Sequence, residues 1–384
     1  LLAESNQTIP PGTWPLRLTI DFAKGEGLTI TALQGAKVMA RLAMADLHKE
    51  RVAGGVALFS ARGAAESKRG FAFSNFSLEG AHGFPKRAFG PVLGVLYTVG
   101  TDMEGERALR FSAQLPVLGP EENPILELRL GNAPPLPGVL STDGSWTCRW
   151  VLPEWKFRRA VPWTLAYEGE EVLKGSIRAE PGPDDAWSLA VLSCVKHQVG
   201  RVRWDSLGLW FPHADLVERL FMHDPDFLYF AGDQLYEGDI TGPDRRSPEI
   251  AVMDYLTRWQ RFLWAFGDLT LSRPAVVVPD DHDVFHGNLW GAGGIRAQGK
   301  RGQDAGGYKM PAAFLKVVHG TQTGNLPPTQ VSPVIGQGVT TWSTAFSWGG
   351  VDFCVLSDRM WKSSPATSVP AGKFRNGWSQ VDGF

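Results

Sequence analysis

Three apolar segments in the second half of the chain constrain the fold most, because each of them runs directly into polar residues. They are WSLAVLSCVKH (187–197), DFLYFAGD (226–233) and RPAVVVPD (273–280). The segments between them, residues 214–224 and 249–269, carry apolar side chains at helical spacing. Continuous apolar runs that alternate with helices indicate an α/β domain whose strands are buried on both faces.

Two further segments belong to the same predicted domain. VDFCVLSDR (351–359) is expected to be a fourth buried strand beside the other three. Residues 291–350 are rich in Gly, Thr, Gln and Pro, and we expect them to form an extended surface excursion between the elements. We assign residues 184–384 to this α/β (α+β) domain.

The first half of the chain has the pattern of all-β structure. Short alternating segments such as PLRLTIDF (15–22) and GLTITALQG (27–35) are bounded by turn residues, which is typical of β-sandwiches. Residues 36–55 depart from this pattern because their apolar residues have helical spacing, and we expect a helix there. The fold class is therefore multidomain, with β-sandwich modules over residues 1–85 and 86–183.

The first of these modules resembles a known type of sandwich. GGVALFSARG (54–63) and FAFSNFSLEG (71–80) are similar to the last two strands of concanavalin-like, laminin-G-like domains. The resemblance implies that residues 1–82 are the tail of a carbohydrate-binding jelly roll, with a glycan as ligand. The alternative is an ordinary sandwich of no particular family.

Composition limits the classes of partner and compartment. Apolar residues make up 43% of the 384-residue chain, which is enough for a sizeable core. The formal charge of −2 gives no reason to expect general affinity for nucleic acid or an anionic membrane, and no segment approaches the roughly 20 apolar residues of a membrane span. Three cysteines are too few for a disulfide framework. Because the chain starts without Met, we expect a processed or truncated piece whose signal peptide is absent.

Candidate ligands gather where the apolar segments end. In open α/β sheets, ligands bind outside the carboxyl ends of the strands. These ends are occupied by the following residues: Ser193, Cys194, Asp233, Tyr236, Asp280, Asp281, His282, Asp358 and Arg359. So many acidic groups on one rim would repel one another unless cations neutralised them. Carboxylates suit a hard cation, whereas a thiolate and a phenolate suit a trivalent or borderline transition metal. Two such metals would polarise a phosphoryl group and generate a hydroxide nucleophile.

The order and spacing of these motifs resemble the alkaline phosphatase D (PhoD-like) branch of the calcineurin-like metallophosphoesterases. The similar segments are Ser193-Cys194, GDQLYE (232–237) and DDHD (280–283). FCVLSDRMWK (353–362) is similar to a later F-x-x-L-D-x-R segment of the branch, with its register uncertain by one residue. The resemblance spans residues 187 to about 362 and implies a metallophosphoesterase-type domain, C-terminally incomplete.

The resemblance also implies roles for individual residues. Cys194 and Tyr236 would ligate Fe³⁺, and Asp233 would bridge it to a divalent partner, Ca²⁺ or another divalent metal. Asp281 would bind that partner, and His282 would act at the substrate as a proton or hydrogen-bond donor.

Three further positions belong to the predicted site or its completion. Asp280 would be a further ligand or would orient His282. Arg359 would clamp a phosphate oxygen or pair with Asp358. The branch completes its centre with a later Asp/His pair, and none follows Arg359, so the iron site is expected to be incomplete.

The predicted function is metal-dependent hydrolysis of a small phosphomonoester or phosphodiester by a metal-bound hydroxide. A periplasmic or extracellular location suits a calcium-dependent enzyme with appended sandwiches. The alternative is a cell-surface glycan-binding protein with a degenerate phosphoesterase domain. Asp283 and His286 are interpreted as possible bystanders, and His319 and Asn325 as candidates on a long loop.

Overall fold

The computed structural model describes residues 16–23, 27–44, 90–119, 121–200, 208–298, 306–329, 336–364, 374–375 and 378–379. The chain divides into two compact units, Leu1–Ala88 and Phe89–Phe384, and each is treated by itself. Within the described ranges, no helix combines the length and the apolarity needed to cross a membrane.

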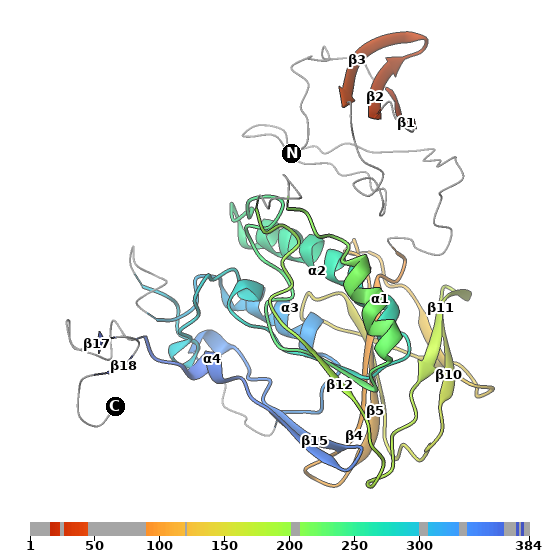
Figure 1. Cartoon of the computed structure of the whole chain (residues 1–384), viewed down its shortest axis with the longest axis vertical. Helices are drawn as coiled ribbons and strands as arrows, with labels where there is room; N and C mark the ends of the chain where they lie inside the picture. Colours follow the sequence, from red (N-terminus) through yellow and green to blue (C-terminus); the bar gives the residue numbers. More distant parts are fainter. Residues whose placement is uncertain are drawn as a thin grey trace. The chain divides into compact units, whose positions relative to one another are not determined.

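The described part of the first unit is an antiparallel meander of three strands, coloured red in Figure 1. The strands are β1 (Arg17–Ala23), β2 (Gly27–Gln34) and β3 (Lys37–Met44). The expected helix over residues 36–55 is therefore wrong where it can be compared, because β3 pairs with β2 along its whole length. Gly35 takes a positive φ of 57° in the turn between them, which allows the chain to reverse and residues 37–44 to pair as a strand. The segments 54–63 and 71–80 lie outside the described residues.

Two antiparallel sheets form a sandwich in the second unit. The six-stranded sheet has the order β16-β15-β4-β5-β9-β8, and the four-stranded sheet has the order β11-β10-β6-β7. Their strands are β4 (Gly94–Asp102), β5 (Arg107–Gln114), β6 (Leu126–Leu130), β7 (Leu136–Pro137), β8 (Val139–Leu140), β9 (Thr147–Leu152), β10 (Val161–Tyr167), β11 (Glu170–Ile177), β15 (Thr344–Trp348) and β16 (Val351–Val355).

Aromatic side chains hold these two sheets together. The ring of Phe111 on β5 meets that of Trp163 on β10 of the other sheet edge-on, with centroids 5.1 Å apart. Within its own sheet, Phe111 also meets Trp150 on β9 edge-on, at 5.8 Å. Such edge-to-face pairs contribute about 0.5–1.5 kcal/mol beyond the burial of their surface. All three side chains are buried, which places the core of the sandwich between β5, β9 and β10.

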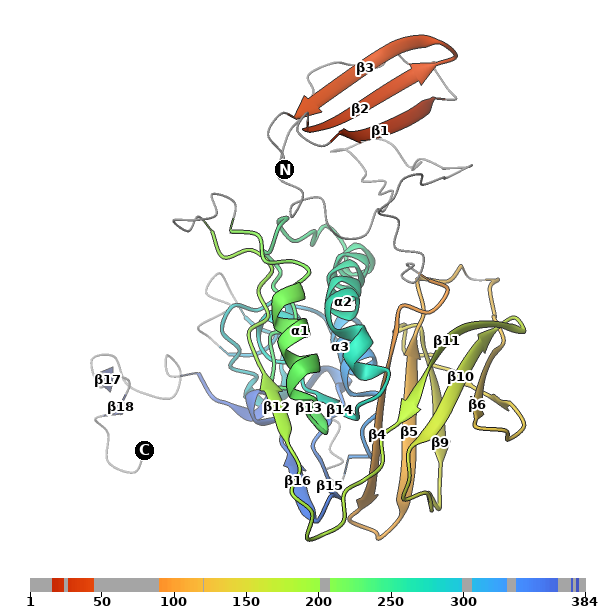
Figure 2. The same cartoon turned by 45° about the vertical axis from the view of Figure 1, so that its right-hand side comes forward.

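A separate parallel sheet confirms the three strands expected from the apolar segments. Its order is β12 (Leu189–Leu192), β13 (Phe227–Phe230) and β14 (Ala275–Val277). The first of them is not buried on both faces as expected, because Leu189 and Val191 are exposed. Figure 2 shows these strands side by side, with α1 (Ala214–His223) and α2 (Pro248–Thr270) running beside them. The unit is thus rich in sheet and carries few helices, as the predicted combination of sandwich and α/β elements requires.

Helix α2 begins and packs as its sequence predicts. Ser247 caps it by accepting a hydrogen bond from the N–H of Ile250, and Pro248 occupies its first turn. Its buried side chains contact both the parallel sheet and the sandwich. Phe262 meets Phe230 of β13 with ring centroids 4.9 Å apart, and Trp259 donates through Nε1 to Oε1 of Gln114 at the end of β5 (3.2 Å).

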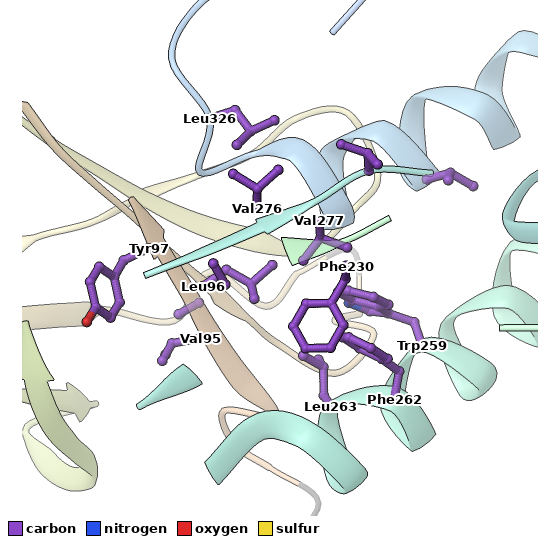
Figure 3. Packing of buried hydrophobic residues seen from close by; sticks show 14 of the residues in the cluster. Val95, Leu96, Tyr97, Phe230, Trp259, Phe262, Leu263, Val276, Val277 and Leu326 are labelled. Carbon is purple, nitrogen blue, oxygen red and sulfur yellow. The ribbon is translucent and has the colours of Figure 1, made fainter. Parts of the chain in front are cut away.

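Figure 3 shows this shared core, in which Val95, Leu96 and Tyr97 of β4, Phe230 of β13, Val276 and Val277 of β14, and Trp259, Phe262 and Leu263 of α2 lie together. All of these residues are buried. The parallel sheet is therefore packed against the sandwich through one continuous core. A rigid scaffold of this kind fixes the ends of β12, β13 and β14 relative to one another.

The fourth apolar segment does not join the parallel sheet, which corrects one expectation. Val351–Val355 forms β16, which pairs antiparallel with β15, and β15 pairs in turn with β4 of the sandwich. Phe353 still contacts the parallel sheet, because its ring stacks on Phe227 of β13 at 4.9 Å. The expectation of a buried strand was also wrong, because Val351 and Cys354 are exposed and only Val355 of this strand is buried.

Residues 291–350 are not an extended surface excursion, and this expectation was also wrong. They contain α3 (Ala312–Thr323) and β15, together with the short 3-10 turns η3 (Ala292–Gly294) and η4 (Gly336–Gly338). Phe314, Leu315 and Val318 of α3 are fully buried. The helix was missed because Gly, Thr and Gln are frequent in this segment, although α3 has an apolar face that packs near β14.

The remaining elements are α4 (Asp358–Trp361), the turn η2 (His282–Val284), and the small hairpin of β17 (Phe374–Arg375) and β18 (Trp378–Ser379). The expected boundary near residue 183 falls inside the second unit, where β15 and β16 share a sheet with β4 and β5. The division into three domains stays a prediction.

Candidate metal centre

The candidate site lies where β12, β13 and β14 end, and backbone hydrogen bonds join the loops that follow β12 and β13. The N–H of Cys194 donates to the carbonyl of Gly232 (3.1 Å), and that of Val195 donates to the carbonyl of Asp233 (2.9 Å). Cys194 and Asp233 both have left-handed backbones, with φ of 58° and 56°. Non-glycine residues in this region are costly and gather at functional sites.

Gly232 allows the loops after β13 and β14 to approach closely. Its φ is 98°, and a Cβ at this position would lie 2.5 Å from Cβ of Asp280. Only glycine fits both the backbone angle and the space. The glycine of GDQLYE therefore brings Asp233 next to the DDHD segment.

The structure brings three of the predicted residues into one cluster. Ligand atoms of Asp233, Asp281 and His282 all lie within 4.8 Å of one another. The two aspartates are buried, with 6% and 8% of their surface exposed, and His282 is half-buried. The arrangement offers two carboxylates and a ring nitrogen to one cation.

Cys194 and Tyr236 join the cluster through Asp233. The Sγ of Cys194 lies 3.7 Å from Oδ2 of Asp233, and the hydroxyl of Tyr236 donates to the same oxygen at 3.0 Å. Cys194 is exposed, whereas Tyr236 is half-buried. A thiol and a phenol thus converge on one carboxylate oxygen.

Burial and crowding shift the pKa values in this cluster. Burial, together with the negative charge of Asp281, raises the pKa of Asp233 to about 6. Burial also raises the pKa of Tyr236, with Cys194 and Asp233 adding to the effect. Both shifts mean that negative charge is disfavoured here without a compensating cation. A bound cation would reverse this balance, because it favours the ionised forms of its ligands.

The imidazole of His282 is held by its neighbours in a defined orientation. Its Nδ1 lies 2.6 Å from Oε2 of Glu237, and its ring centroid lies 4.1 Å from that of Tyr236. Its backbone N–H donates to Oδ1 of Asp233 at 3.2 Å. Burial lowers the pKa of His282, but the hydrogen bond to Glu237 and the negative charges of Glu237, Asp233 and Asp281 together outweigh it, so the net shift is upward. Sequence reasoning assigned no role to Glu237, although it stands in the GDQLYE segment.

Asp280 and Arg359 are paired with each other. Nε of Arg359 lies 3.1 Å from Oδ1 of Asp280, and Nη2 donates to Oδ2 at 3.2 Å, which is a two-point ion pair. Burial raises the pKa of Asp280, and Arg359 partly offsets that rise. Arg359 therefore neutralises this carboxylate at the edge of the site, whereas the cluster of ligand atoms consists of Asp233, Asp281 and His282.

Asp283, interpreted from sequence as a possible bystander, connects the loops of the site. Its Oδ2 accepts hydrogen bonds from the N–H groups of Asp233 (2.7 Å) and Asp280 (2.9 Å), and its Oδ1 accepts one from Gln322 of α3 (3.0 Å). Complete burial raises the pKa of this carboxyl to about 8. Gln322 is a second residue that sequence reasoning missed, because its partner lies 39 positions away.

Other candidates from the sequence have structural contacts. Asn325 is fully buried and donates through its amide to the carbonyl of Ala275 (2.8 Å). His319 is buried on α3, and His286 is buried with its N–H bonded to the carbonyl of Asp281 (2.9 Å).

The donor set fits a metal centre. Asp233 and Asp281 supply the carboxylate oxygens that hard cations prefer, and Cys194 and Tyr236 supply softer anionic ligands. The centre is positioned at the carboxyl ends of parallel strands, the place where ligands bind in open α/β sheets. Fold and site together define a candidate metal centre at the carboxyl ends of a parallel sheet that packs against a β-sandwich.

The fold is similar to that of a solved structure described as the structure of PhoD. The TM-score is 0.51 at 14% sequence identity, and the match covers 71% of this chain and 52% of that one. The chain thus spans about half the length of the structure it matches. At this identity the likeness shows the fold, and it supports the resemblance to the PhoD-like branch at that level.

Purple acid phosphatase PPD1 from yellow lupin (Lupinus luteus) seeds is also similar, with a TM-score of 0.39 at 9% identity, over 68% of this chain and 43% of that one. No protein-family model and no curated protein matches the chain.

Proposed function

We propose that the chain is a metal-dependent phosphoric ester hydrolase that acts on a small phosphomonoester or phosphodiester. The observation that supports this most is the convergence of Cys194, Asp233, Tyr236, Asp281 and His282 at the ends of three parallel strands. A periplasmic or extracellular setting is part of the proposal. So is a glycan as a partner of the first unit.

Each group of the site has a proposed task. Cys194, Tyr236 and Asp233 would hold Fe³⁺, and Asp233 with Asp281 would hold Ca²⁺ or another divalent ion. When bound, these cations would withdraw charge from the phosphoryl oxygens and lower the pKa of water. The chain itself supplies two buried carboxylates, Asp233 and Asp281, whose loops are fixed by hydrogen bonds.

His282 would act on the leaving group. A water oxygen forms the new bond to phosphorus while the bond to the leaving oxygen breaks. The leaving oxygen takes a proton from the ring of His282, and the ring recovers a proton from solvent. The raised pKa of His282 suits a proton donor, because it enlarges the protonated fraction near neutral pH. Arg359, neutralised in part by Asp280, would stand at the rim as a contact for a phosphoryl oxygen.

Metal analysis of Cys194→Ala tests the iron ligands. We expect the iron content to fall in this variant, because the thiolate is one of three proposed ligands. Cys354→Ala is the matched control, since Cys354 is also exposed but lies on β16. Equal iron in the wild type and in Cys194→Ala would contradict the ligand assignment.

Hydrolysis of a chromogenic phosphoester by Asp281→Ala tests the second cation position. We expect activity to be lost, by on the order of a hundredfold or more, while the circular dichroism spectrum is unchanged. Asp184→Ala removes an exposed aspartate outside the site and should keep full activity. Retained hydrolysis by Asp281→Ala would exclude the proposed role of this carboxylate.

A further inference from the structure

Glu237 directly follows Tyr236, and both of its carboxylate oxygens have partners. Oε2 lies 2.6 Å from Nδ1 of His282, and Oε1 lies 3.5 Å from Nη2 of Arg245. The side chain is 15% exposed, so water competes little for these contacts. Glu237 is therefore a shielded carboxylate held between one imidazole and one guanidinium.

Arg245 attaches this carboxylate to the turn that carries His282. The same Nη2 donates to the carbonyl of Phe285 at 2.9 Å, and the guanidinium lies over the Phe285 ring, 5.6 Å from its centroid. Phe285 ends the turn η2 that begins at His282. The loop after β13 and the loop after β14 are thus connected by two polar contacts on the side of Nδ1.

These contacts restrict the ring of His282 in position and in rotation. Tyr236 covers one face, the backbone N–H is bonded to Asp233, and Glu237 occupies Nδ1. Nε2 is then the ring nitrogen available to a ligand. A carboxylate that accepts from one imidazole nitrogen sets the tautomer and the direction of the other.

The geometry points to Glu237 as the positioning residue for His282, which it orients so that Nε2 faces the leaving oxygen of the phosphoester. This inference rests on the proposed function, because it gives His282 a task only if an ester is cleaved. In the step itself, the proton leaves Nε2 for the leaving oxygen, and the proton on Nδ1 stays in the hydrogen bond with Glu237. A solvent proton then restores the ring.

The kinetic test compares two esters with different leaving groups. Phenolate needs a proton donor more than 4-nitrophenolate does, because it is the stronger base. We expect Glu237→Ala to lower kcat on phenyl phosphate by about 10–100-fold and on 4-nitrophenyl phosphate by about 5-fold or less, with KM and metal content nearly unchanged. Glu237→Gln should recover most of the loss, since its amide oxygen can accept from Nδ1.

The matched control is Glu218→Ala, which removes an exposed glutamate on α1 and should leave both rates unchanged. An equal loss of kcat on both esters, or no loss on either, would overturn the inference. So would a loss accompanied by release of metal, because Glu237 would then support the ligands instead of the ring.

A second measurement does not depend on activity. Nitrogen-15 spectra of the imidazoles, recorded at one pH without added metal, report the tautomer of His282, and His282→Gln identifies its signals. We expect Glu237→Ala to move these signals toward those of the exposed His223, and Glu218→Ala to leave them in place. Unchanged His282 signals would overturn the inference. An inactive wild-type chain with the expected spectra would contradict the proposed function alone.

Discussion

Asp283 shows how one buried side chain organises the candidate site at the scale of a residue. Its carboxylate accepts hydrogen bonds from the backbones of Asp233 and Asp280 and from the side chain of Gln322. It thereby holds the loops after β13 and β14 against α3. A carboxylate in this place positions the candidate metal ligands without belonging to their cluster.

We predict that Asp283→Ala destabilises the fold, because it leaves the N–H groups of Asp233 and Asp280 buried without an acceptor. Each unpaired group costs roughly 1–3 kcal/mol. Urea unfolding should show a lower midpoint, and metal affinity should fall as well. The exposed Asp184→Ala serves as control. A variant as stable as the wild type would show that these bonds contribute little.

The burial of His319 predicts that the stability of the fold depends on pH. It is 8% exposed, and burial lowers its pKa from 6.5 to about 4, although a hydrogen bond to the backbone of Thr340 opposes the shift. The unfolded chain therefore binds more protons than the folded one between pH 6.5 and 4. The folded state is therefore fully stable with respect to this group above pH 6.5 and loses stability as the pH falls from 6.5 to 4. At pH 5 the loss in the free energy of unfolding is about 2 kcal/mol.

The measurement for His319 is the difference in unfolding free energy between pH 7.5 and pH 5. This difference should be smaller by about 2 kcal/mol in His319→Gln than in the wild type. His223→Gln, at an exposed position, should match the wild type. The burial of His319 would not govern the pH dependence if both variants behaved alike.

At the scale of an element, the contact between β4 and β15 joins the C-terminal strands to the sandwich. Gly100 on β4 leaves room for this contact, since a Cβ there would lie 2.7 Å from Cδ2 of Phe346 and 3.0 Å from the carbonyl of Ser347. The absence of a side chain at Gly100 thus decides whether β15 can reach its place.

Gly100→Val should therefore reduce the free energy of unfolding by about 1–3 kcal/mol, because the added methyl groups collide with β15. Gly267 on α2 is the control, and a substitution there should raise the free energy of unfolding, since a Cβ at this position meets no atom within 4 Å. Gly267→Ala should stabilise the helix by about 0.5–1 kcal/mol. Chemical denaturation measures both, and equal shifts in one direction would contradict the placement of β15.

The whole second unit is expected to unfold as one cooperative body, because α2 packs on both the sandwich and the parallel sheet. Trp259 bonds Gln114 of β5, and Phe262 packs on Phe230 of β13. Hydrogen exchange should therefore give the same opening free energy for the amides of β5 and β13. A sheet that exchanged at clearly lower free energy than the other would mean that the shared core does not couple them.

The parallel strands and the helices between them could be predicted because their signals are local. An apolar run of four to six residues or a helical period depends only on neighbours in the chain. The rim of ligands followed from the same signals, since the carboxyl ends of parallel strands meet at one edge. β16 was misplaced because its apolar residues do not specify the partner strand, and most residues of the strand are exposed. α3 was missed because Gly, Thr and Gln interrupt its apolar pattern.

The sequence by itself determined the residue types at the ends of β12, β13 and β14, and with them the chemistry of a candidate metal site. Tertiary structure alone decided that Arg359 neutralises Asp280, that Glu237 binds His282 and that Asp283 ties the loops together. The physical reason is the separation of these partners along the sequence. These partners lie 79, 45 and 50 positions apart, so their contacts depend on how the scaffold closes the intervening chain.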